Sequence, residues 1–124
     1  MSVLDNSTIK HFSLPGLVHQ TLASHKEGLQ NTEVWMQTVE PGGETPVHYH
    51  DCEEVIVILR GSGQLSIDGK VIGFGPNSTL IIPPDIVHQL TNSGTEEIVL
   101  IASLSSTPAK AFTPDGEELV LPWQ

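Results

Sequence analysis

The chain has 124 residues, of which 38% are hydrophobic and 16% charged, and its formal net charge at pH 7 is −10. This length suits a domain with its own core, and the composition is too apolar for a disordered chain. The basic residues are few and scattered, which argues against a nucleic-acid partner or an anionic membrane surface. We therefore expect residues 1–124 to form a single domain, with a motif-bearing core at about residues 33–104.

The cysteine content and the N-terminal sequence indicate in which cellular compartment the protein is expected. A single cysteine, Cys52, leaves no partner for an internal disulfide and is typical of a reducing environment. The first residues lack the basic and then apolar run of a secretory signal, and no apolar stretch approaches the length of a membrane span. The sequence thus predicts a cytoplasmic protein.

Short runs rich in Val, Ile, Leu and Thr follow one another along the chain, separated by Gly, Pro, Asn and Asp. They predict an all-β fold, either a sandwich or a closed barrel. The Asp68-Gly69 pair suits a type I′ hairpin turn, and we expect loose ends at about residues 1–12 and 105–116. The expected strands cover residues 17–23, 33–40, 45–50, 54–61, 63–69, 70–74, 78–84, 87–92, 97–104 and 117–123.

The stretch HYHDCEEV (residues 48–55) concentrates potential metal ligands. If it were one straight strand, His48 and Glu54 would lie about 20 Å apart, too far for one ion. We therefore expect the polar residues 51–53 to form a turn, after which Glu54 faces His50 across a hairpin. His48 and His50 share a strand face, so this geometry selects His48, His50 and Glu54 as ligands.

A fourth ligand has to come from another segment. His88, which follows a Pro-Pro turn and begins a strand-like run, is the best candidate. The other histidines are weaker candidates: His11 and His25 lie in polar surroundings rich in strand-breaking residues, and His19 lies in an expected strand.

These residues resemble the motifs of the cupin superfamily. The first cupin motif, G-x5-H-x-H-x3,4-E-x6-G, is filled by Gly42, His48, His50, Glu54 and Gly61. The resemblance implies a small cupin with a single antiparallel β-barrel of jelly-roll type. It also implies a metal near the open end of the barrel, held by His48, His50, Glu54 and His88.

The second cupin motif, P-x-G-x2-H-x3-N, is matched by Pro83, His88 and Asn92. Asp85 stands where the glycine is usual, and Asn77 stands at the glycine six positions before the proline. We expect Gly75 to replace that earlier glycine through a shifted turn.

Other polar and aromatic residues carry less specific signals. Cys52 is interpreted as an unliganded thiol on the rim of the site, although a thiolate is a strong ligand for zinc or copper. Trp35 and Trp123 are interpreted as packing residues that could also stack on a ligand. Polar side chains that could line a cavity are Gln37, Gln64, Gln89 and Thr91.

Three imidazoles and one carboxylate suit a divalent iron, manganese, nickel or zinc ion and leave coordination positions open. We favour a metal-dependent enzyme, either a dioxygenase or a Lewis-acid isomerase, cyclase or lyase, with Glu54 as a possible catalytic base. The alternative is a non-catalytic binding or sensing protein whose metal anchors a ligand or stabilises the fold.

Because positively charged residues are scarce, the sequence limits the ligand that either an enzyme or a binding protein of this kind could hold. Arg60 is the only cation near the first motif, so we expect a neutral or singly charged organic molecule that chelates the ion through its own oxygens. We also expect a homodimer, because the C-terminal strand-like segment could cover a sheet edge or pair with a second subunit.

Overall fold

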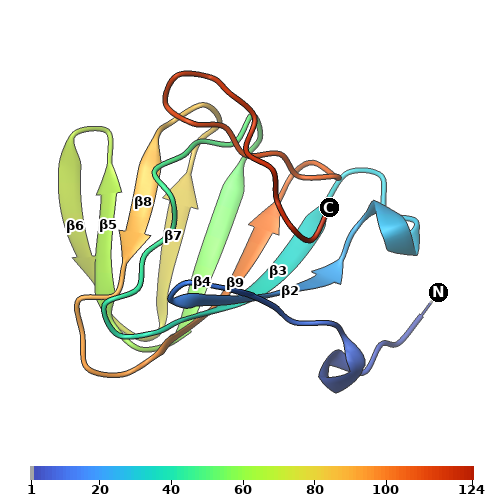
Figure 1. The fold of residues 1–124 in the computed structure, drawn as a ribbon, viewed down its shortest axis with the longest axis horizontal. Coiled ribbons are helices and arrows are strands. Elements are labelled where there is room, and N and C mark those ends of the chain that lie inside the picture. The colour runs from blue at the N-terminus through green and yellow to red at the C-terminus, as the bar shows by residue number, and fades with distance from the viewer. Residues whose placement is uncertain (1) are drawn as a thin grey trace.

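The computed structural model of the protein describes residues 2–124. Within this range, antiparallel pairing arranges the strands into two sheets (Figure 1). A six-stranded sheet has the order β1-β2-β3-β9-β4-β7, and a three-stranded sheet has the order β6-β5-β8. The strands are β1 (Phe12–Leu14), β2 (Leu17–Ala23), β3 (Glu33–Val39), β4 (Glu54–Arg60), β5 (Gly63–Ile67), β6 (Lys70–Phe74), β7 (Ser78–Ile82), β8 (His88–Thr91) and β9 (Ile98–Leu104).

The predicted all-β, antiparallel architecture is confirmed, whereas closure of the two sheets into one barrel stays a prediction. Two short 3-10 helices, Asn6–Thr8 and His25–Glu27, interrupt the β structure near the N-terminus. No helix in the described part of the chain is long and apolar enough to cross a membrane.

The core is built by alternation along the strands of the larger sheet. Residues of β3, β4 and β9 alternate between buried and more exposed positions, as strands with one covered face do. Buried Leu65 and Leu90 of the smaller sheet join Ile56 and Leu100 of the larger one in a single cluster. The same alternation brings the acidic Glu33 and Glu54 inside, each 3–4% exposed.

Residues 45–50 do not form the predicted strand. They make isolated bridges instead, His48 with His88 and Tyr49 with Phe112. The prolines and polar residues around them prevent a continuous ladder, because each proline lacks an amide donor. The segment nevertheless runs beside β8, with His48 N donating to His88 O at 3.1 Å and His88 N donating to His48 O at 2.8 Å.

The two chain ends also differ from expectation. Phe12–Leu14 pairs with β2 as β1, a strand that was not among those expected from the sequence. Residues 117–123 form no strand, and residues 105–116 are not loose, since Ala109 and Ala111 are buried. Figure 1 shows this C-terminal part arching over one end of the sheets and returning toward β3.

Left-handed backbone conformations explain the departures from the second cupin motif. Asn77 and Asp85 have φ values of 61° and 66°, so each adopts the conformation for which a glycine is usual. Gly75 does not have a positive φ, and the predicted compensation by Gly75 is therefore wrong. The Asp68-Gly69 turn is confirmed, with φ values of 50° and 73°.

Candidate metal centre

Glu54 is the first residue of β4 and occupies an inward position of the strand. Its backbone lies in register between Ile82 of β7 and Leu104 of β9, so the sheet fixes the direction of the carboxylate. Ile56 and Ile58 follow on the same buried face. A carboxylate in such an apolar row requires polar or cationic partners.

The three histidines come from the opposite side of the core. His48 and His50 lie on the irregular segment beside β8, and His88 begins β8 itself. Residues 51–53 then carry the chain to β4 of the larger sheet. The predicted bend is therefore present, but His50 and Glu54 face each other across the space between two sheets rather than across a hairpin.

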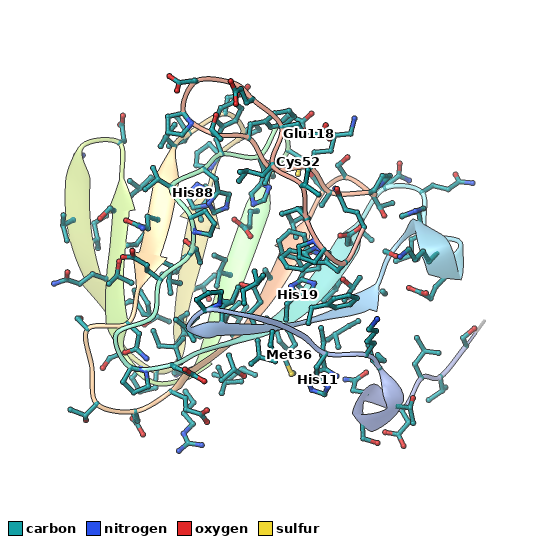
Figure 2. The ribbon with its side chains drawn as sticks, viewed as in Figure 1. His11, His19, Met36, Cys52, His88 and Glu118 are labelled. Carbon is teal, nitrogen blue, oxygen red and sulfur yellow. The ribbon has the colours of Figure 1, made fainter. Side chains whose placement is uncertain are left out.

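The structure brings all four predicted ligands together. The ring nitrogens of His48, His50 and His88 lie within 4.8 Å of one another. Glu54 Oε1 lies 3.6 Å from His50 Nε2 and 3.3 Å from His88 Nε2. Figure 2 places His88 beneath the C-terminal segment, at the same end of the molecule as Cys52 and Glu118.

Backbone carbonyls orient the three imidazole rings. The Nδ1 atoms of His48, His50 and His88 lie 2.6, 2.7 and 2.9 Å from the carbonyl oxygens of Pro46, Lys110 and Ile86. A carbonyl only accepts, so each Nδ1 carries the proton and donates. In the neutral rings the Nε2 lone pairs then remain free, as in metal sites whose outer hydrogen bonds select the tautomer.

The electrostatics of the cluster indicate a need for a cation. His48 Nε2 lies 3.2 Å from His50 Nε2, so two lone pairs face each other, and Glu54 Oε1 has no hydrogen-bond partner among the described residues. Four electron-pair donors thus converge on one point. Nitrogen and oxygen donors of this kind fit a divalent transition-metal ion, although assignment of these residues as its ligands stays a prediction.

The pKa values of His48 and Glu54 also favour the protonation states that bind a metal ion. Burial, together with the nearby charges of His88 and His50, lowers the pKa of His48 to about 4, so this ring is neutral at pH 7. Burial by itself raises the pKa of Glu54, but the adjacent imidazoles of His88, His50 and His48 outweigh it and hold this pKa below its ordinary value. A neutral imidazole and an ionised carboxylate are the forms that bind metals.

A cavity of about 170 Å³ adjoins the cluster. The four predicted ligands line one part of it, Trp35 and Gln37 line another, and the C-terminal residues Leu119–Trp123 contribute a further wall. No lysine or arginine is among the described residues that line it. The cavity is therefore apolar except at the histidine cluster and at a few neutral polar groups.

Of the polar residues considered as cavity lining, Gln37 lines this cavity, whereas Gln64 is exposed and Gln89 donates to the carbonyl of Thr45. Thr91 is partly buried and also lies outside the cavity. Sequence reasoning missed Glu33 and the carbonyl of Lys110, both of which contact site residues. Alternation within EVWMQTV places Glu33 on the same face as Trp35 and could have identified it.

Cys52 is not a rim residue as predicted. It is 7% exposed and packs in the hydrophobic core, and burial raises the pKa of its thiol. A buried thiol of raised pKa is a poor nucleophile, so Cys52 acts as an apolar packing residue.

His19 is buried too, but in a separate aromatic group. Its ring stacks on Trp123 with centroids 3.5 Å apart, and its nitrogens lie 2.8 Å from Thr21 Oγ1 and 3.0 Å from Gln37 Nε2. Trp35 packs edge-on against both His19 and His50, at centroid distances of 5.0 and 5.8 Å. The predicted packing roles of Trp35 and Trp123 are confirmed, since both are buried, and both also line the cavity.

Comparison with solved structures supports the fold. A polyketide cyclase, RemF from Streptomyces resistomycificus, superimposes with a TM-score of 0.78 at 20% identity, over 98% of this chain and 87% of that one. A cupin-2 domain from Rhodospirillum rubrum gives a TM-score of 0.77 at 21% identity, over 91% and 80% of the two chains. At these identities the likeness shows the cupin fold alone.

Sequence comparison gives a narrower relationship. Auxin-binding protein 1 of Arabidopsis thaliana is 42% identical over 112 residues, 82% of this chain and 57% of the relative. Auxin-binding protein T85 of Nicotiana tabacum is 39% identical over 118 residues, 86% of this chain and 63% of the relative. The chain thus spans about three-fifths of the length of these curated relatives. A family model described as auxin binding protein matches residues 3–122, and this small cupin therefore belongs to the auxin-binding protein family.

Proposed function

We propose that this protein binds a small organic ligand of the auxin type at a divalent metal ion held by His48, His50, Glu54 and His88. The observation that carries the proposal is the convergence of these four donors at the wall of an apolar cavity. The names of the relatives support the choice of ligand class. When bound, the ion would supply a positive charge and open positions for an oxygen donor.

The charge and size of the cavity limit the ligand. With three neutral imidazoles and one carboxylate, a divalent ion leaves one net positive charge at the site. The lack of Lys or Arg in the lining means that a second anionic group on the ligand would have no partner. A volume of about 170 Å³ admits a small molecule, and the Trp35 and Trp123 rings offer flat apolar contact. A singly charged or neutral compound with an aromatic or aliphatic body fits these conditions.

The metal itself is proposed only by class. Mixed imidazole and carboxylate ligation suits iron(II), manganese(II), nickel(II) or zinc(II), and the donor set does not choose among them.

A metal-dependent enzyme is the second candidate, and the environment of Glu54 favours it. This carboxylate is buried, lines the cavity, and has one oxygen without a hydrogen-bond partner in the described structure. In this candidate the oxygen leaves the metal during turnover and then accepts a proton from the ligand held beside it. A dioxygenase step or a Lewis-acid isomerisation, cyclisation or lyase step belongs to this candidate.

One experiment tests the proposal. The protein is purified without added metal, its metal content is measured by elemental analysis, and ligand binding is then measured by isothermal titration calorimetry. The titrants are auxin, small aromatic carboxylates and neutral hydroxylated compounds. We expect about one metal per chain and ligand binding that is lost in His50→Ala but kept in His25→Ala, whose side chain is exposed and does not line the cavity. Binding that persists after removal of the metal would contradict the proposal.

The enzyme candidate is separated from the binder by product analysis. Oxygen uptake and ligand consumption are followed for the wild type and for Glu54→Gln, with the metal content of each measured. Turnover by the wild type that is lost in a metal-loaded Glu54→Gln variant would favour the enzyme, whereas an unchanged ligand in both would favour the binder.

We further propose that residues 1–124 act as one domain and that two copies associate through the outer face of the larger sheet. Val55, Val57, Leu59 and Ile81 are between 38% and 73% exposed on this part of the molecule. Exposed apolar side chains on neighbouring strands are typical of an interaction surface.

A further inference from the structure

Glu33 is a buried acidic residue outside the predicted metal ligands. It begins β3, is 3% exposed, and its two carboxylate oxygens accept hydrogen bonds from different parts of the molecule. Oε2 accepts from Trp35 Nε1 at 2.6 Å. Oε1 accepts from Thr107 Oγ1 at 2.9 Å and from Ala109 N at 3.3 Å.

The donors to Glu33 belong to two walls of the cavity. Trp35 lines the cavity from β3, next to His50. Thr107 and Ala109 begin the segment of residues 107–123, here named the C-terminal cover, which supplies Leu119–Trp123 to the lining. One carboxylate therefore connects a fixed wall on the sheet to a wall that has no strand pairing of its own.

The C-terminal cover also holds a predicted metal ligand. The carbonyl of Lys110, one residue after Ala109, accepts the proton of His50 Nδ1 at 2.7 Å. This contact sets the tautomer of His50 and the direction of its Nε2. A displacement of the cover at Ala109 would thus reach both the cavity wall and the metal cluster.

The hydrogen bonds to the Glu33 carboxylate contribute to holding the C-terminal cover against the rest of the molecule. A hydrogen bond to a charged group is roughly twice as strong as one between neutral groups. Further anchors of the cover are the backbone bonds of the Tyr49–Phe112 pair, the His25 N donation to Thr107 Oγ1 at 2.7 Å and, at the far end, the Lys26 Nζ donation to Trp123 O at 3.3 Å. Glu33 is the charged member among the described residues that fasten the start of the cover.

We propose that Glu33 is a positioning residue that fastens the C-terminal cover to Trp35, and that it thereby holds this wall of the cavity in place and keeps His50 aligned for metal binding. This inference rests on the proposed function for its consequence at the metal, but the fastening itself does not require a metal. A residue that only packed in the core would affect the stability of the whole fold. A positioning role for Glu33 predicts a local effect, on the C-terminal cover and on the metal cluster.

The test uses Glu33→Gln in the full chain. This substitution keeps the side-chain shape but turns one acceptor into an amide donor, so the bond from Trp35 Nε1 or the bond from Ala109 N is lost, because neither N–H group can accept. Glu40→Gln is the matched control, since Glu40 is exposed and directly follows the same strand. Hydrogen exchange of the cover amides is measured by NMR, together with the indole N–H signals of Trp35 and Trp123.

In the wild type the indole proton of Trp35 should resonate downfield of that of Trp123, whose Nε1 has no hydrogen-bond partner in the described structure. In Glu33→Gln we expect the Trp35 signal to move upfield, or the amides of residues 109–112 to exchange at least about tenfold faster, or both. Zinc affinity, measured by competition with a chromophoric chelator, should fall several-fold. Glu40→Gln should match the wild type in all three measurements.

If Glu33→Gln fails to fold, Thr107→Val serves in its place, since it removes the hydroxyl that joins the cover to Glu33 and that also accepts from His25 N. The proposal is overturned if the folded variant loses thermal stability while cover exchange and zinc affinity stay at the control values. If the wild type binds no zinc or other divalent metal, the proposed function fails, and the exchange data still decide whether Glu33 fastens the cover.

Discussion

His48 and His50 face each other with their Nε2 atoms 3.2 Å apart, while the Nδ1 atom of each ring donates to a backbone carbonyl. In the neutral rings two lone pairs then lie in close contact inside a partly buried site. A bound cation removes this repulsion, so metal binding and fold stability are linked at this pair.

Metal removal should therefore lower the melting temperature of the wild type. A ligand at one hundred times its dissociation constant stabilises the native state by about 2.7 kcal/mol. The measurement is differential scanning fluorimetry with added zinc and with a chelator. His50→Ala should lose the difference between the two conditions and His25→Ala should keep it. An equal chelator effect in the wild type and in His50→Ala would show that the metal binds elsewhere.

Gly61→Ala should destabilise the protein more than Gly69→Ala. Both glycines have positive φ, 85° and 73°, which costs an alanine about 1–2 kcal/mol. At Gly61 an added Cβ would also clash with the backbone carbonyl oxygen of Glu97, whereas nothing lies within 4 Å of one at Gly69. Urea denaturation gives the unfolding free energy of each variant, and the difference between them measures the clash with Glu97. Equal losses of unfolding free energy in the two variants would contradict this account.

Acid should destabilise the metal-free protein through His19. Burial lowers the pKa of His19 from 6.5 to about 3, so below pH 6.5 the unfolded chain takes up a proton that the native state does not. The stability contributed by neutral His19 is present above pH 6.5 and is lost as the pH falls toward 3. Since one pKa unit corresponds to about 1.4 kcal/mol, the loss between pH 7.5 and pH 5 is about 2 kcal/mol.

The check is urea denaturation of chelator-treated protein at these two pH values. His48 contributes in the same direction, but it is present in every variant compared. His19→Gln should therefore show a smaller pH difference than the wild type, and His25→Gln the full one. An undiminished difference in His19→Gln would assign the acid sensitivity to other groups.

The proposed self-association should depend on the outer face of β4. Val57 points outward and is 38% exposed at the middle of this strand. Val57→Asp places a charge in the proposed interface and should convert a dimer to a monomer, as measured by light scattering after size-exclusion chromatography. Val3→Asp, at a fully exposed position near the N-terminus, should leave the mass unchanged. A monomeric wild type would rule the interface out.

Several features could be predicted from the sequence because they depend on local rules. The two-residue period of a strand puts Glu54 on the same face of β4 as Ile56 and Ile58, and ligand spacing singles out His48 and His50. The Asp68-Gly69 hairpin follows from the left-handed conformations that these two residues tolerate. Each of these signals lies within a few consecutive residues.

Other features depended on contacts between distant segments. Cys52 was expected on the rim from its polar neighbours, but the chain passes between the sheets there and buries the thiol. Residues 117–123 looked like a strand, yet in the structure they form no strand, and Leu119–Trp123 line the cavity instead.

The sequence by itself determined the all-β class and the set of four candidate ligands, since strand alternation and motif spacing are properties of neighbouring residues. Only the tertiary structure decided that His50 and Glu54 meet across two sheets, that the carbonyl of Lys110 orients His50, and that Glu33 joins Trp35 to the C-terminal cover. Those contacts join residues far apart in the chain. Their distances are set by how the two sheets pack, which no local pattern encodes.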